Sequence, residues 1–501
     1  MLQADALILL IHSLSASEKK KFRTGRKKAD YTLLYDIIEA SGTASSDEIK
    51  AEFKKKKGGS FSATVTYLYK TLLDSLLALR ENQDSHYALF NQILKSRILF
   101  EKSLFEEAIS LLEQIKKKAR HHENPIALLF ASRLELEYLL FLNLPDLSER
   151  DLLNKHFQIN ETLKDIRKIN EHSSLYELLR HRIIYKGNIR SQKQKDMLND
   201  LVISEMSINS SHKDSFEIRK NHLLFQSNYL IGTGDYKSAL HSFRELNRLF
   251  ESHPLFWSSQ PFYYVSVLEG ILDNLRSMKS YDEMPYFIAQ LRNIRVNTEG
   301  LQNQINALTF LYELFPLLDR GDFEASKALT EKYKDTVLAR KENLSLVMRA
   351  EISLYLSLIH IGFRNFKLAQ KTLLSEIVRG NNIYILPSYR TIRLVNLIIH
   401  YELDNSDIVH SESRSIKREI SKVEKAYRVE HLRLSSLGKE KKTRLPRERE
   451  KLWKKYQPVL EELRGDIFEN QLLKSFDFTA WVEASIKRVA LGEVLRGRAT
   501  G

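Results

Sequence analysis

The sequence predicts an all-α protein in which pairs of antiparallel helices are stacked along the chain. Three observations predict this fold class. Only 9 prolines and 17 glycines interrupt 501 residues, too few for many short strands joined by tight turns. Long segments are instead rich in Leu, Ile, Glu, Lys and Arg, which favour helices. The third observation is an internal repeat with a period of 42 to 47 residues.

Composition narrows the class of protein further. Apolar residues make up 43% and charged residues 28% of the chain, as in ordinary globular proteins. A chain of this length exceeds one conventional core unless it is a repeat array, in which each unit packs on its neighbours. Cysteine is absent, which excludes disulfides, thiolate metal sites and cysteine nucleophiles. The net charge of +14 permits attraction to nucleic acid, anionic lipid or an acidic protein.

Residues 1–80 do not follow the repeat and are expected to form an N-terminal helical bundle. The segment 15–18, Ser-Ala-Ser-Glu, has the residues of a capping box and opens a short basic helix. Further helices are predicted over 31–40, over 45–54 and over about 60–80.

Two interpretations of this bundle stay open. In the first it is a helix-turn-helix whose recognition helix covers 63–72. The exposed face of that helix then carries Thr64, Thr66, Tyr67 and Lys70. The lysines that meet phosphates are Lys54, Lys55, Lys56 and Lys57. Against this, the connecting loop is long and the recognition helix has one basic residue, so we favour a cap that covers the apolar face of the first repeat.

From residue 81 to 432 one arrangement of turn and helix recurs. Within Gly234–Leu240, a Gly-Asp turn precedes an aromatic residue, and a small residue follows three positions later. We expect Asp235 to N-cap the coming helix, Tyr236 to start its apolar face and Ala239 to let the paired helix approach closely. The residues that occupy the position of Tyr236 in the successive units are Phe105, Leu147, Ile189, Tyr236 itself, Tyr281, Phe323, Phe366 and Ile408. Each unit therefore holds two helices of roughly 15–20 residues and two short turns.

The first helix of each pair shows a second regularity. Ser96, Ser227 and Ser357 each lie twelve residues before an alanine of the second helix. These alanines are Ala108, Ala239 and Ala369. A small residue at each position lets the two helices cross closely.

These units resemble tetratricopeptide repeats, in which a small residue, a Gly-Asp-aromatic turn and an alanine recur in this order. The resemblance covers about residues 85–430. It implies an α-solenoid of about eight helix pairs whose concave face binds proteins or peptides. The period here is longer than the family's usual ~34 residues, so longer helices are expected.

The resemblance also implies that the first helices of the pairs line the concave groove. Projecting the units onto this arrangement places polar side chains inward at Arg97, Asn221, Asn228 and Asp273. Leu224 and Phe225 are possible groove anchors, although apolar residues at helical spacing are more often core. Some members of the family hold a peptide carboxylate with repeated Lys and Asn; only Asn228 matches such a position, so that clamp is not carried over.

Residues 433–501 are expected to form a basic helical arm followed by a C-terminal cap. Residues 411–465 hold 17 lysines and arginines against 9 acids. Pro446 suits the first turn of a second charged helix of this arm. Three roles stay open for this arm: it packs on the repeat array, it dimerises, or it binds a polyanion. In the last case the contacts are Lys439, Lys441, Lys442, Arg444, Arg447 and Arg449.

The C-terminal aromatic residues of 476–481 are expected to dock as a cap. Together with the opening segment 10–19, they give the chain an overall layout that resembles helical proteins of the Bacteroidota. This resemblance implies no activity.

No sequence motif points to catalysis. The chain has no phosphate-binding glycine loop, no His-Glu-x-x-His, no nucleophile elbow and no kinase signature. The adjacent His121 and His122 point about 100° apart on a helix and make a poor metal site. No catalytic residue, metal ligand or cofactor is therefore predicted. No apolar run approaches the ~18–20 residues of a membrane span, and no signal peptide is evident, so a cytoplasmic location without membrane insertion is expected.

The sequence thus favours a non-enzymatic scaffold that binds a protein or peptide on its concave face. The alternative is a nucleic-acid-binding or transcription-regulatory protein that uses the N-terminal helices or the 411–465 arm. The partner's identity and the oligomeric state stay open.

Overall fold

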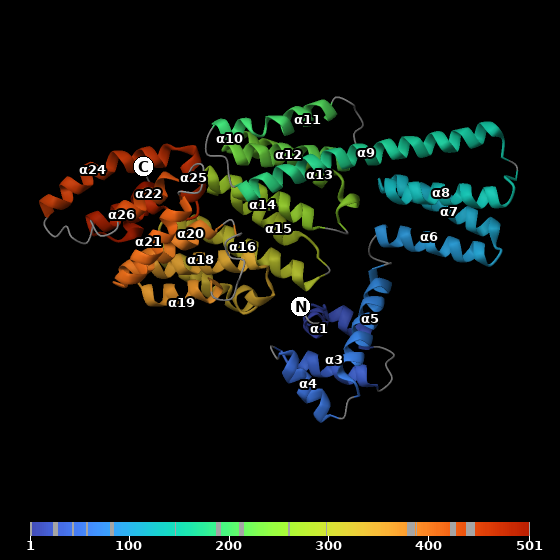
Figure 1. The fold of residues 1–501 in the computed structure, drawn as a ribbon, viewed down its shortest axis with the longest axis horizontal. Helices are drawn as coiled ribbons and strands as arrows, with labels where there is room; N and C mark the ends of the chain where they lie inside the picture. Colours follow the sequence, from blue (N-terminus) through green and yellow to red (C-terminus); the bar gives the residue numbers. More distant parts are fainter. Residues whose placement is uncertain are drawn as a thin grey trace.

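In the computed structural model the described part of the chain is all-α, with 26 α-helices and no strand (Figure 1). This confirms the predicted all-α class. None of the described helices is both long and apolar enough to cross a bilayer. The structure describes all residues except 1–2, 24–28, 43–44, 57–58, 81–84, 146, 187–191, 210–214, 259–260, 297, 378–385, 387, 421–426, 437–445 and 500–501.

The N-terminal bundle has a hydrophobic core of its own. Its helices are α1 (Gln3–His12), α2 (Ala16–Arg23), α3 (Asp30–Ala40), α4 (Ser46–Lys55) and α5 (Phe61–Arg80). Leu7, Tyr35, Phe53 and Leu68 are among the side chains buried in this core. The predicted capping box is present, because the Ser15 N–H donates to the Glu18 carboxylate at 2.8 Å. The bundle meets the rest of the chain where α5 contacts the next helix, α6 (Ser85–Glu101).

After the bundle, helices that follow one another in sequence pack side by side. Those of the first half are α7 (Phe105–His121), α8 (Pro125–Phe141), α9 (Glu149–Lys186), α10 (Gln192–Asp196), α11 (Asn199–Asn209), α12 (Phe216–Thr233) and α13 (Tyr236–Ser252). Those of the second half are α14 (Phe262–Ser277), α15 (Met284–Asn293), α16 (Glu299–Asp319), α17 (Phe323–Lys332), α18 (Leu346–Gly362), α19 (Phe366–Ile377), α20 (Tyr389–Glu402) and α21 (Ser406–Ile420). The short helical turns between them are η1 (Pro254–Phe256), η2 (Tyr281–Glu283), η3 (Lys334–Leu338) and η4 (Lys341–Asn343).

The recurring turn uses one backbone geometry. Gly234 has a φ of +82°, and its N–H donates to the Ile231 carbonyl at 3.0 Å, while the next N–H donates to the Leu230 carbonyl at 2.9 Å. These two bonds satisfy carbonyls that the end of α12 would otherwise leave open. The same pair of bonds, also with positive φ, recurs at Ser103, Lys279, Gly321 and Arg364.

The side chain of Asp235 then starts the next helix. Its carboxylate accepts the Ser238 N–H at 3.1 Å, and Asp322 accepts the Ala325 N–H at 3.0 Å in the equivalent turn. The predicted N-cap role of these acids is confirmed.

The predicted close crossing of paired helices is also present. The small residues Ser96, Ala108, Ser227, Ala239, Ser357 and Ala369 are all fully buried. The Ser357 hydroxyl donates to the Ala369 carbonyl at 2.7 Å, across the pair α18 and α19. A larger side chain at either position would separate the two backbones.

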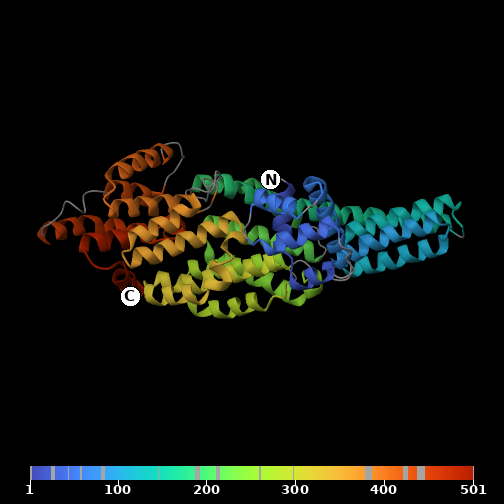
Figure 2. The ribbon, with the colours of Figure 1, turned by 90° about the horizontal axis from the view of Figure 1, so that it is seen from below.

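The predicted alternation of short helices and turns is absent at α9, which runs for 38 residues without a turn. The repeat places the end of one pair and the start of the next within this stretch. Residues 149–186 contain neither glycine nor proline, so nothing in them stops a helix. The expected turn at Ile189 lies outside the described residues. In both views α6, α7 and α8 extend beside α9 at one end of the molecule (Figures 1 and 2).

The C-terminal helices pack against the helices α12–α21, which we call the array. They are α22 (Arg428–Ser436), α24 (Pro446–Gly465), α25 (Ile467–Leu473), α26 (Phe478–Lys487) and α27 (Leu491–Ala499). Leu463, Phe478 and Trp481 are buried in the same core as the helices α12–α21. Residues 446–499, which we call the C-terminal segment, therefore pack on this body, which is one of the alternatives expected for the basic arm.

Candidate binding surfaces

The C-terminal segment contacts polar residues of α14. The Lys474 ammonium donates to both oxygens of the Asp273 carboxylate, at 2.7 and 2.8 Å, and to the Ser277 hydroxyl at 3.2 Å. The Arg276 guanidinium donates to the Lys474 carbonyl at 2.7 Å. Asp273, which was predicted to line the binding groove, thus contacts the chain's own C-terminal segment.

Arg276 is the centre of a buried polar network at this contact. Its guanidinium lies 3.6 Å from the centre of the Phe315 ring and donates to the Tyr355 hydroxyl at 3.0 Å. It also donates to the Asp319 carboxylate at 3.2 Å, which accepts the Tyr281 hydroxyl at 2.9 Å. Every charge here is paired, as a buried ion pair requires to be stable. The network fixes the positions of α14, α16, α18 and the C-terminal segment.

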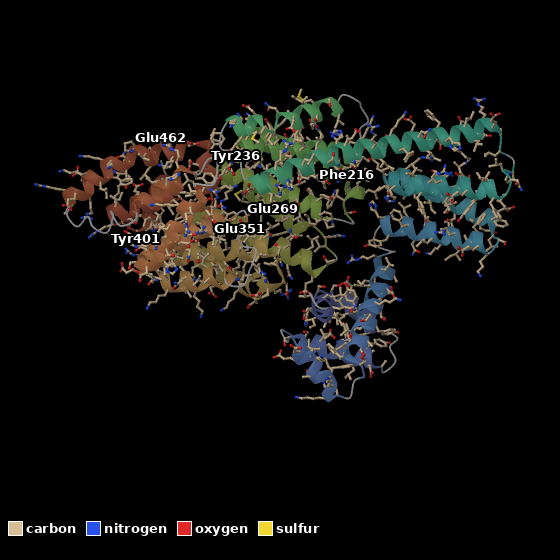
Figure 3. All side chains as sticks on the ribbon, viewed as in Figure 1. Phe216, Tyr236, Glu269, Glu351, Tyr401 and Glu462 are labelled. Atoms are coloured by element: carbon tan, nitrogen blue, oxygen red, sulfur yellow. The ribbon has the colours of Figure 1, made fainter. Side chains whose placement is uncertain are left out.

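Two further carboxyl groups lie near this network, Glu269 on α14 and Glu351 on α18 (Figure 3). Burial, together with the nearby Glu351 and Asp273 carboxylates, raises the pKa of Glu269 to about 7. Burial also raises the pKa of Glu351, although Arg276 opposes this effect. Near neutral pH the region around Glu269 and Glu351 therefore carries less negative charge than fully ionised carboxyl groups would give it.

Most of the residues predicted to line a groove hold the fold together instead. Leu224 and Phe225 are buried in the core, because the apolar face of α12 packs against neighbouring helices. Asn221 is buried and donates to the Ser173 hydroxyl at 2.8 Å. Asn228 accepts a hydrogen bond from Arg180 at 3.1 Å. Leu224, Phe225 and Asn221 are therefore not free to meet a partner, whereas Asn228 is partly exposed.

Arg97 is the exception, since it is exposed on α6 beside a face of apolar side chains. Tyr87, Phe90, Leu94 and Ile98 are 43%, 41%, 56% and 56% exposed. They follow one another at spacings of three, four and four residues, so they lie on one side of the helix. We call these four residues the α6 face.

The α6 face shows that the N-terminal bundle does not cap the first repeat as predicted, since the bundle buries its apolar residues in its own core. The sequence did carry a signal: α6 has apolar residues on two sides, of which Leu89 and Ile93 supply the core side. Neighbouring helices also expose apolar residues, namely Ile126, Phe130 and Phe141 on α8 and Leu153 and Phe157 on α9.

The residues of the predicted polyanion site are only partly brought together. Lys54, Lys55 and Lys56 are exposed at the end of α4, and Lys70 is exposed on α5 with Thr66 and Tyr67. Thr64 was predicted to be exposed, but it is buried, because it lies on the same face of α5 as the core residues Leu68 and Leu72. Arg447 is exposed and Arg449 partly exposed on α24. Lys57, Lys439, Lys441, Lys442 and Arg444 lie outside the described residues.

Within the described residues, no group of three or more His, Asp or Glu side chains is arranged to hold a metal ion. Comparisons with models of protein families, with curated proteins and with solved structures found no match.

Proposed function

We propose that this protein is a non-enzymatic scaffold that binds a protein partner through the α6 face. We further propose that its helix pairs form a tetratricopeptide-like α-solenoid, which the recurring turn at Gly234 and the close crossing of Ser357 and Ala369 support. The observation that carries the function is the exposure of four large apolar side chains on one side of α6. Contiguous apolar patches on a protein surface typically mark sites of association.

The partner presents an acidic amphipathic helix to this face. Lys95 and Arg97 lie on opposite borders of the apolar stripe, about 100° from Leu94 and from Ile98 respectively. A helix with apolar residues at the matching spacing can cover the stripe, and an acid beside them can meet Arg97. The net charge of +14 also favours association with an acidic partner.

The proposed binding surface lies on α6 and not on the helices that contact the C-terminal segment. The Asp273 region already holds Lys474 of the C-terminal segment, so a peptide would have to displace an intramolecular contact there. The α6 face has no such occupant among the described residues.

A designed peptide can test the proposal on the full-length protein. The probe is a fluorescent helical peptide with a Leu stripe flanked by Glu, and fluorescence anisotropy reports its binding. We expect Leu94→Lys to weaken binding at least about ten-fold, because it places a charge in the apolar stripe. Arg97→Glu should weaken it as well. The matched control is Ile203→Lys, at an exposed apolar residue on α11.

Three outcomes would contradict the proposal: binding unaffected by Leu94→Lys, equal binding of a peptide with Lys in place of Glu, or a dimer of the chain that Leu94→Lys dissociates. The last outcome, measured by sedimentation equilibrium, would assign the α6 face to a second copy of this chain.

The exposure of Lys54, Lys55 and Lys56 at one helix end supports nucleic-acid binding as a second candidate function. Affinity for a duplex should then fall steeply with salt, and replacing the three lysines with Gln should flatten this dependence. A salt-independent affinity would exclude it.

A further inference from the structure

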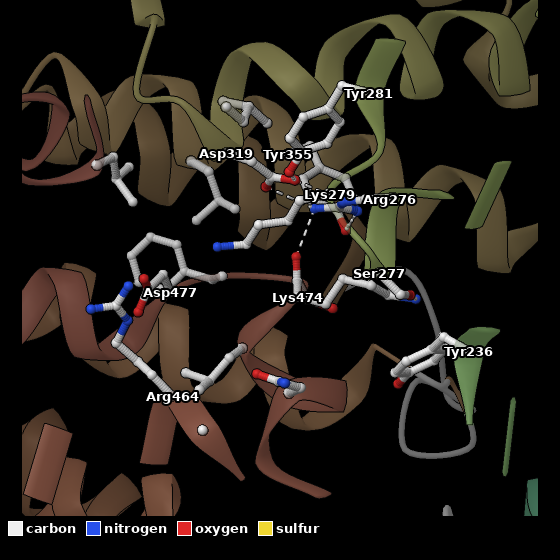
Figure 4. A pocket seen from close by; sticks show the side chains of 18 of the residues that line it. Tyr236, Arg276, Ser277, Lys279, Tyr281, Asp319, Tyr355, Arg464, Lys474 and Asp477 are labelled. Carbon is white, nitrogen blue, oxygen red and sulfur yellow. Dashed lines mark hydrogen bonds and ion pairs between the residues drawn. The ribbon is translucent and has the colours of Figure 1, made fainter. Parts of the chain in front are cut away.

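A cavity of about 370 Å³ lies between the turns of the array and the C-terminal segment (Figure 4). The array contributes Lys279 and Tyr281 from one turn and Tyr355 and Leu358 from α18. The C-terminal segment contributes Glu461, Arg464, Gly465, Asn470, residues 473–477 and Leu495 to its lining. Pockets that hold small ligands usually have volumes of about 300 to 1,000 Å³, so this cavity is large enough for one.

Most of the charges that line this cavity are already paired. Arg276 is bonded to Asp319, and Lys474 to Asp273. The Asp477 carboxylate accepts from Arg498 at 2.7 Å.

Three charged side chains of the lining take no part in these pairs. Lys279 and Arg464 are exposed to the cavity, and neither has an ion-pair partner within the part of the chain that the structure describes. The third is Glu461, which lies on α24 three residues before Arg464 and accepts a hydrogen bond from Gln457 at 2.9 Å. Two cations against one acid leave the lining with one positive charge in excess.

The turn of the array directs Lys279 into the cavity. Lys279 has a φ of +57°, at the position that glycine occupies in the equivalent turns of Gly234 and Gly321. Lysine is disfavoured in this left-handed conformation, which glycine adopts freely. Figure 4 shows its side chain reaching towards the middle of the cavity, across from the C-terminal segment.

Apolar and aromatic groups form the remaining wall. Phe323 and Leu358 come from the array, and Phe476 and Leu495 come from the C-terminal segment. Binding sites for small molecules commonly combine such an apolar wall with a few charged groups that orient the ligand.

We propose that this cavity binds a small organic anion, whose phosphate or carboxylate group lies between Lys279 and Arg464. The apolar part of the ligand packs against Phe323, Leu358 and Phe476. Lys279 belongs to the array and Arg464 to the C-terminal segment, so the bound anion bridges the two. The ligand therefore strengthens the docking of the C-terminal segment. This inference is independent of the α6 face.

Phenyl phosphate, which has one anionic and one apolar part, is a suitable probe for calorimetric titration of the full-length protein. Lys279→Met and Arg464→Met should each weaken its binding by about ten-fold, because a charge-assisted contact to the anion is lost. Glu461→Gln should tighten binding, since it removes an acid from the lining. Lys237→Met, at an exposed lysine of α13 outside the cavity, is the matched control and should have no effect.

Two other probes separate the parts of the ligand. Inorganic phosphate should bind more weakly than phenyl phosphate, and benzyl alcohol should not bind at this site. Bound phenyl phosphate should also slow amide hydrogen exchange in residues 466–478. The proposal is overturned if phenyl phosphate does not bind, if both Met variants bind it as the wild type does, or if Glu461→Gln weakens binding. Both Met variants change exposed side chains, and thermal unfolding would verify that each is folded.

Discussion

The Lys474 ammonium lies 2.7 Å from the Asp273 carboxylate, although 201 residues separate the two along the chain. This ion pair holds the C-terminal segment on α14. A second contact lies further along the segment, where the backbones of Gly321 and Gly492 meet. The array and the C-terminal segment consequently form one packed body.

Lys474→Met should loosen this docking. The variant leaves Asp273 partly buried without its cation, and we expect a loss of about 1 to 2 kcal/mol in the free energy of unfolding. Hydrogen exchange should accelerate in residues 467–499 more than elsewhere. Lys454→Met is the control, because its pair with Glu450 is an exposed contact within α24. Unchanged exchange in 467–499 would show that the ion pair does not hold the segment.

Gly321→Ala should destabilise the same contact from the array side. Gly321 has a φ of +71°, and a Cβ atom there would lie 2.7 Å from the Gly492 carbonyl oxygen. Backbone strain and the collision with Gly492 should together lower the free energy of unfolding by about 2 to 4 kcal/mol. A lower midpoint of urea unfolding would show this loss. Gly300→Ala, at a glycine of α16 with open space around its Cβ position, should be neutral or slightly stabilising. Equal midpoints for the two variants would contradict this account.

Glu269→Gln should change how stability depends on pH. Burial and the nearby acids raise the folded-state pKa of Glu269 from 4.5 to about 7. A raised pKa gives stability that is fully present below the unfolded value and is lost as the pH rises through 7. The variant should therefore match the wild type near pH 4 and exceed it at pH 8 by about 1 to 3 kcal/mol.

Thermal unfolding at both pH values measures this difference. Glu324→Gln, at an exposed carboxyl of α17, is the control. A variant that is no more stable than the wild type at pH 8 would refute the prediction.

His172 should make the protein sensitive to acid. It is buried, and its Nδ1 has no hydrogen-bond partner among the described residues. Burial lowers the pKa of His172 below 6.5, with Glu205 opposing this and His222 adding to it. The neutral ring is thus favoured in the fold, and stability present above pH 6.5 is lost as the pH falls towards the folded-state pKa.

His172→Gln should reduce the loss of stability between pH 7 and 5, measured by denaturant unfolding. His241→Gln, at an exposed histidine of α13, should leave the loss unchanged. The same pH dependence in wild type and His172→Gln would rule out this role.

The α6 face and the core of α12 show where prediction from the sequence stops. Leu224 and Leu94 both occupy apolar positions of a helix, yet the first is 7% exposed and the second 56%. Helical spacing says that such residues share a face, but it does not say which other element covers that face. Whether the α6 face is covered depends on where the N-terminal bundle buries its own apolar residues. No local sequence pattern encodes that choice.

The sequence by itself determined the helices, the turn at Gly234, the N-cap of Asp235 and the close crossing of Ser357 and Ala369. Each of these depends on residues within about a dozen positions, where backbone conformation and hydrogen bonds are local. Only the tertiary structure decided that Lys474 meets Asp273, that Lys279 and Arg464 share a cavity and that the α6 face is left open. These features follow from the return of a distant segment, because burial and charge pairing depend on which surfaces come together in space.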